Sequence, residues 1–207
     1  MKLLTPLRVG LSLFLLGAGL GRLGAQTPAE PVLVEVSNIR FDSNVRGLGP
    51  GESWYEVAIE VDAKPADPRG SDRHVDRVRV TLNLGIENTV DKSKNGFDFY
   101  RASAEAVALE QGKAFFRFYL PHEVVKRDGI RGDAKYYSID IEAEGKQQPP
   151  SRKSFSNAFT TPASLQAFQS RASSEGGVND GILQPQYLTP FAFTSGKPAP
   201  SFIRIER

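Results

Sequence analysis

A string of oxygen-bearing side chains at Asp91–Asp98 has the spacing in this sequence that best matches a metal site. Oxygen side chains alternate along it and Gly96 permits a sharp turn, as at the start of a calcium-binding loop. The twelfth position of such a loop needs a bidentate acid, but here it is Ala102, which cannot bind a metal. Lys92 and Lys94 add positive charge beside the ion's place. We therefore expect a polar hairpin turn here, with no metal.

Residues for other common kinds of catalysis are scarce. His74 and His122 are the only histidines, so few residues are available for a Ser-His-Asp triad or a two-histidine metal site. The chain has no cysteine, which excludes thiol nucleophiles and zinc-cysteine sites. Acidic residues are scattered, and no spacing singles out a carboxylate pair of the glycosidase type. We expect no catalytic residue, no metal and no cofactor.

Phe115, Arg117 and Tyr119 form the most interesting candidate surface. They alternate with Phe116 and Phe118, so in a strand they share the face opposite to these two rings. Aromatic residues with arginine are typical of protein interaction surfaces. The sequence leaves a second interpretation open, in which the C-terminal part of the same chain covers these side chains.

The elements that must position these residues are short strands with alternating apolar and polar residues, separated by turn residues. Strands are expected from Val32 onward and over 54–61, 78–86, 97–109, 114–120, 136–143 and 155–159. A hairpin turn is expected at Asn95-Gly96. This pattern predicts an all-β fold, an antiparallel immunoglobulin-like β-sandwich over residues 26–160.

Two helical segments and a long tail complete the expected architecture. Pro121–Arg127 predicts one helical turn, and Thr161 predicts the N-cap of a short helix whose apolar face carries Leu165, Phe168 and Ala172. Residues 182–207, here called the C-terminal tail, are rich in proline yet hold many large apolar residues, which is unusual for a disordered segment. We expect the tail to lie extended over one sheet or along its edge, in its own chain or on a neighbouring subunit. Its expected anchors are Phe191, Phe193, Phe202 and Ile203.

Residues 1–25 have the order of a secretory signal peptide. Lys2 and Arg8 precede an uncharged apolar run from Val9 to Leu20, and small residues follow up to Ala25, after which we expect cleavage. A lipoprotein would need a cysteine after the run. A retained pilin-type helix is the other alternative, but residues 10–25 lack the acidic residue that usually follows the prepilin cut.

Removal of this segment changes the charge of the chain. It holds three of the 26 basic residues and none of the 24 acidic ones, so the chain that remains has one more acidic than basic residue. A near-neutral protein carries no electrostatic footprint for nucleic acid or for docking onto a membrane surface. Without disulfides, its stability must come from packing and strand pairing.

Four strand sequences together resemble a known family. Val34–Phe41, Trp54–Val61, Phe118–Val125 and Tyr136–Glu142 are similar to segments of the immunoglobulin-like, pilus-associated secreted proteins of Akkermansia-type Verrucomicrobia. The resemblance covers roughly residues 32–160 and rests on strand patterns, so no site residue can be carried over. It implies a role without enzymatic activity, in an envelope system that includes a type IV pilus-like secretin.

These observations lead to two functional hypotheses. The first is a non-enzymatic structural or adaptor protein of a cell-envelope, type IV pilus-like system, located in the periplasm, at the outer membrane or on the cell surface, with other envelope or pilus-like assembly proteins as partners. The alternative is a secreted carbohydrate- or ligand-binding sandwich, in which Trp54 and surface tyrosines would stack on sugars. A hydrolase accessory domain is a third, weaker interpretation.

Overall fold

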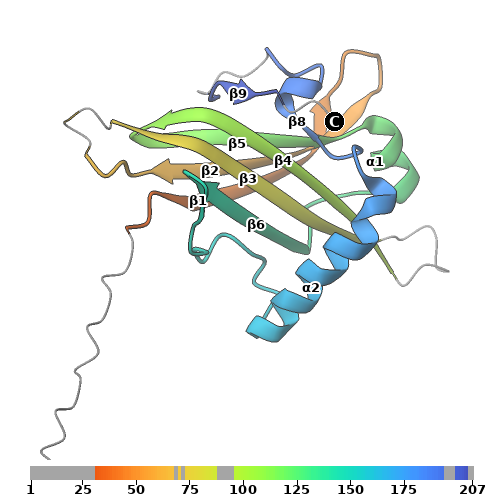
Figure 1. Cartoon of the computed structure of the whole chain (residues 1–207). Coiled ribbons are helices and arrows are strands. Elements are labelled where there is room, and N and C mark those ends of the chain that lie inside the picture. Colours follow the sequence, from red (N-terminus) through yellow and green to blue (C-terminus); the bar gives the residue numbers. More distant parts are fainter. Residues whose placement is uncertain (1–30, 68–69, 71–72, 88–95, 194–198, 205–207) are drawn as a thin grey trace, which may run out of the picture. The chain divides into compact units, whose positions relative to one another are not determined.

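Two antiparallel sheets that face each other make up the fold (Figure 1). The structure is a computed structural model that describes residues 31–67, 70, 73–87, 96–193 and 199–204. The strands in this part of the chain are β1 (Val34–Arg46), β2 (Ser53–Ala63), β3 (His74–Glu87), β4 (Phe97–Glu110), β5 (Gly112–Leu120), β6 (Tyr136–Ala143), β7 (Lys146–Gln147), β8 (Gln184–Pro185) and β9 (Phe202–Ile203). The expected signal peptide and the positions 91–95 of the metal-like string lie outside the described residues.

The order of the strands is that of an immunoglobulin-type sandwich. One sheet has the order β1-β2-β5-β8 and the other β7-β6-β3-β4-β9. Strands one, two and five therefore share a sheet, while strands three, six and seven share the other, as in immunoglobulin domains, with β4 paired to β3. The predicted all-β sandwich is confirmed.

The core lies between the two sheets because alternate residues of each strand point inward. Val57, Ile59 and Val61 of β2 and Leu82 and Leu84 of β3 are fully buried in it. Burial of each such side chain stabilises the folded state by about 1.5–3 kcal/mol, and this packing stabilises a chain that has no disulfides.

Two α-helices have the predicted positions. α1 (His122–Asp128) follows Pro121 and ends at Gly129, whose φ of 63° is the left-handed conformation that glycine adopts without a steric penalty. α2 (Pro162–Glu175) begins at the N-cap Thr161 with a capping box. Its Phe168 packs with Phe99, on the outside of the β3–β4 pair, and no helix in the described residues is long and apolar enough to cross a membrane.

The C-terminal tail adds one short strand to each sheet. Residues Gln184–Pro185 pair with β5 and Phe202–Ile203 pair with β4, so the tail covers the edge strands on one side of the sandwich (Figure 1). A 3-10 turn, η2 (Gln186–Leu188), follows β8, and another, η1 (Gly176–Asn179), precedes it. Proline-rich segments suit such edges because proline cannot donate to a central ladder.

Three details of the sequence-based interpretation are wrong. Phe155–Phe159 is not a strand, because only Phe155 forms a bridge, to Ser138 of β6, before the chain turns. The strand expected from Val32 onward begins only at Val34. Phe193, expected as an anchor, is 99% exposed.

Candidate functional site

A groove of about 630 Å³ crosses the outward face of the β1-β2-β5-β8 sheet. Its walls come from three strands and from the C-terminal tail, which contributes Gln186 and Phe191. The three predicted surface residues, Phe115, Arg117 and Tyr119, all line it.

The pairing of the strands arranges the groove in three cross-strand rows. One row is Asn38–Glu60–Phe115, the middle row is Arg40–Ala58–Arg117, and the third is Asp42–Glu56–Tyr119. Residues in one row point to the same face and neighbouring strands are about 4.8 Å apart. In the middle row the small Ala58 therefore separates two arginines whose backbones are about 10 Å apart.

Glu60, in the first row, is buried and paired with its own neighbours. Its Oε1 lies 2.7 Å from Lys113 Nζ and accepts a hydrogen bond of 3.0 Å from Ser37 Oγ. The hydrogen bond from Lys113 lowers the pKa of Glu60, against the opposite effect of burial. This carboxylate is therefore ionised, and its charge is balanced within the protein.

Glu56, in the third row, has a partner of a different kind. Tyr119 Oη donates a hydrogen bond of 2.5 Å to Glu56 Oε2. Burial is the largest effect on the Tyr119 hydroxyl, and together with the neighbouring Glu56 it raises the pKa well above the ordinary value, so the hydroxyl stays a neutral donor. The ring of Phe191 stacks on Tyr119 at a centroid distance of 4.7 Å, which fixes the position of the tyrosine.

Arg117, in the middle row, differs from both acids because its charge has no counterion among the described residues. It is only 7% exposed, yet no carboxylate in the described part of the chain lies within ion-pair distance of it. Its Nη1 donates a hydrogen bond of 3.3 Å to Gln186 Oε1, and its guanidinium lies 5.2 Å from the centre of the Phe115 ring. A guanidinium has five N–H donors, and one weak hydrogen bond leaves most of them available to the groove, since no Arg117 nitrogen is among the buried atoms without a partner.

The tail fixes the polar partner of Arg117. Gln186 Nε2 donates to the carbonyl oxygen of Phe191 (2.9 Å), which turns Oε1 of the same amide toward Arg117. Thr189 Oγ1 donates to the carbonyl oxygen of Gln186 (2.7 Å) and holds the turn. The tail therefore forms one wall of the groove and orients its buried cation.

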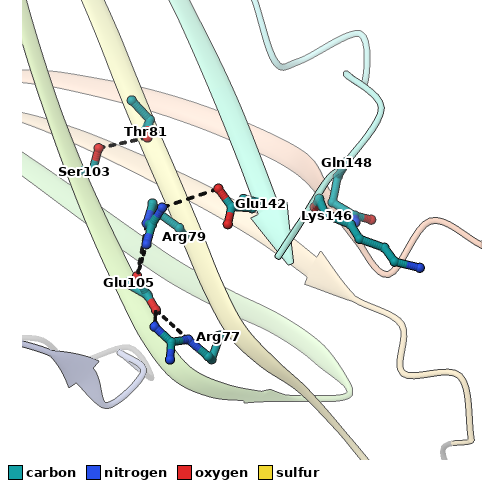
Figure 2. A network of polar contacts seen from close by, with 8 residues as sticks. All are labelled: Arg77, Arg79, Thr81, Ser103, Glu105, Glu142, Lys146 and Gln148. Atoms are coloured by element: carbon teal, nitrogen blue, oxygen red, sulfur yellow. Dashed lines mark hydrogen bonds and ion pairs between the residues drawn. The ribbon is translucent and has the colours of Figure 1, made fainter. Parts of the chain in front are cut away.

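The outward face of the other sheet holds a polar network in which the charges are paired (Figure 2). Glu105 is buried between Arg77, whose Nη2 lies at 2.9 Å, and Arg79, whose Nη2 lies at 2.7 Å. Arg79 also reaches Glu142 at 3.4 Å. Arg77 has a φ of 49° and lies two residues before Arg79, so the two side chains share one face of the strand. Internal charge pairing gives this network a structural role, in contrast to the site around Arg117.

The other candidate residues have structural places. Nδ1 of His122 accepts a hydrogen bond of 3.1 Å from the Ser53 N–H, and His74 is an exposed residue 3.8 Å from Glu110. Trp54 is half-buried, makes a T-shaped contact with Phe191, and has a buried indole Nε1. Within the described residues, no group of three or more histidine or acidic side chains is arranged to hold a metal ion.

Sequence reasoning brought together the three residues of β5 and left open that the C-terminal part of the chain covers them, but it missed the acidic residues beside them. The structure leaves Phe115 partly exposed, while the tail covers Tyr119 and helps to bury Arg117. Period-two alternation placed Glu56 and Glu60 on the polar face of their strand, but the register that sets them beside Tyr119 and Phe115 has no signal in the sequence.

Comparison with known proteins gives a likeness in fold. No family model matches the chain, and no curated protein matches it. Among solved structures, it is similar to a crystal structure of a protein from Akkermansia muciniphila, with 17% sequence identity and a TM-score of 0.59. The match covers 86% of this chain and 97% of that one. At this identity the likeness shows the fold alone, and the organism fits the resemblance found in the sequence.

Proposed function

We propose that the chain is a non-enzymatic adaptor protein of the cell envelope that binds a partner protein through the groove on the β1-β2-β5-β8 sheet. The fold shared with an Akkermansia protein and the signal-peptide pattern support export and an envelope location, within a type IV pilus-like system. Sandwich domains bind partners with sheet faces and edges, and such binding needs no catalytic residue.

The observation that carries this proposal is the groove itself. Its floor is shaped by Ala58, its walls carry aromatic rings, and a buried arginine lies within it without a counterion among the described residues. Arginine and aromatic residues in a desolvated depression are the usual energetic centre of a protein interface.

Site-specific photocrosslinking in the native cell tests the proposal. A photoreactive phenylalanine at Ala58, on the floor of the groove, should crosslink to one or a few exported envelope proteins. The same group at Ser103, on the outward face of the opposite sheet, is the control and should not give the same products. Crosslinks only to cytoplasmic proteins, or equal products from both positions, would contradict the proposal.

A secreted ligand-binding module is the second candidate, and the volume of the groove favours it. Pockets that hold small molecules measure about 300–1,000 Å³, and this groove lies in that range. Trp54, which we expected to stack on sugars, is half-buried and in contact with Phe191. Neutral oligosaccharides that shift the NMR signals of groove residues at millimolar concentration would favour this candidate over the adaptor.

A further inference from the structure

We infer that Arg117 is the recognition site for a single carboxylate of the partner, carried on an apolar peptide segment that lies in the groove. This inference rests on the proposed adaptor function and adds the chemistry of the partner. The central observation is that a side chain only 7% exposed keeps a full positive charge with no carboxylate of the described residues beside it.

A charge that is largely removed from water is costly, and folded proteins normally pair it. The chain pairs its buried glutamates in this way, since Glu60 has Lys113 and Glu105 has Arg77 and Arg79. The exception at Arg117 lies in a groove large enough to admit a ligand. An anion from outside the chain would complete the pair.

The form of the guanidinium selects a carboxylate. Arg117 packs over Phe115, and Gln186 accepts one hydrogen bond, from Nη1. The remaining N–H donors form a planar fork that matches the two oxygens of a carboxylate. Arg40, across Ala58 in the same row, adds a second positive charge at the exposed side of the groove.

The acids of the groove argue against a polyanion as the ligand. Glu56 flanks the middle row and Asp42 lies at the rim, so a chain of closely spaced negative charges would be repelled. The rings of Phe115 and Phe191 instead favour apolar groups next to the anion. A ligand with one carboxylate among apolar side chains is therefore a peptide, rather than an acidic polysaccharide or a nucleic acid.

A pair of isosteric peptides tests the inference. N-acetyl-phenylalanyl-aspartate amide and N-acetyl-phenylalanyl-asparagine amide differ in the carboxylate alone, and each is titrated into ¹⁵N-labelled protein while the Nε–Hε signal of Arg117 is followed. The acid should bind at least about tenfold more tightly than its amide, and added salt should weaken only the acid. Equal binding of the two peptides would overturn the inference.

Three variants connect the effect to the site. Arg117→Gln should abolish the difference between acid and amide, whereas Arg131→Gln, an exposed arginine outside the groove, should leave it unchanged. Ala58→Phe fills the floor without touching the fold's core and should block both peptides, which keeps the inference testable if Arg117→Gln does not fold. Retained acid preference in a folded Arg117→Gln protein would contradict the assignment.

Two further results separate the possible failures. Tighter binding of trigalacturonate than of the acidic peptide, lost in Arg117→Gln, would overturn the peptide and assign the site to an acidic sugar. Crosslinking of an envelope protein from Ala58 combined with equal binding of the two peptides would support the adaptor function and contradict recognition of a carboxylate by Arg117. Tighter binding of the acidic peptide without any envelope crosslink would support carboxylate recognition and contradict the adaptor function.

Discussion

Replacement of Leu183 tests whether the C-terminal tail is part of the folded domain. Leu183 lies just before β8, is 1% exposed and belongs to the main core, although it is distant in the sequence from β5, with which β8 pairs. Leu183→Ala removes buried methyl groups and leaves a cavity, which costs about 2–5 kcal/mol. Since a domain has only about 5–15 kcal/mol in total, the loss is a large share of its stability.

Thermal and urea unfolding measure this loss, and Leu188→Ala is the matched control. Leu188 lies farther along the same tail and is 51% exposed. At roughly 2–4 °C per kcal/mol for a domain of this size, Leu183→Ala should lower the Tm by about 4–20 °C, and Leu188→Ala by much less. Equal and small effects of the two substitutions would show that the tail does not contribute to the core, and the account of the groove wall would fail with it.

Three further predictions concern other parts of the chain. Burial alone would raise the pKa of Glu105, but hydrogen bonds from two arginines outweigh it and lower the pKa. The contribution of Glu105 to stability is therefore complete above about pH 4.5, and it is lost as the pH falls through the lower pKa of the folded state. Glu105→Gln should therefore cost about 1–3 kcal/mol at neutral pH and flatten the decline of Tm in acid; an unchanged acid profile would contradict this. Gly85→Ala should destabilise the protein by about 1–3 kcal/mol, because the new Cβ would lie 2.9 Å from Phe168 Cε2, and the shift should appear in the near-UV signal of the aromatic cluster under α2. Intact mass of the exported protein should give a first residue at Gln26, and a mass that retains Val9–Leu20 would indicate a pilin-type anchor instead.

The sandwich was predictable because each strand is indicated by a pattern within its own segment of the sequence. Alternation in Trp54–Val61 reports which face of that strand is buried, and this pattern largely survives in the structure. In Val78–Ile86 the apolar residues are buried as predicted, but the polar face is buried as well from Val80 onward. The helix starts were equally local, since Thr161 and Pro121 act through their own backbone and the next turn.

The site was predictable only in part because it depends on distant contacts. The exposure of Arg117 and Tyr119 is set by a tail that follows them much later in the sequence, and no periodicity in either segment reports that contact. Likewise, the row of Arg40, Ala58 and Arg117 results from two strand registers. A sequence shows which side chains lie on each face of a strand. Which strand pairs with it, and in which register, depends on the whole fold.

The position of the two edge strands β8 and β9 also has a consequence for the order of folding. A chain leaves the ribosome from its N-terminus, so β1 to β6 are all available before the last part of the tail is made. Until then the outer edges of β4 and β5 lack the strands that pair with them in the finished protein, and open edges are templates for association with other chains. These pairings also join residues far apart in sequence, which makes them slow to form. A chain released without its last residues would keep the positions on β4 and β5 that these two short strands cover open to association with other chains.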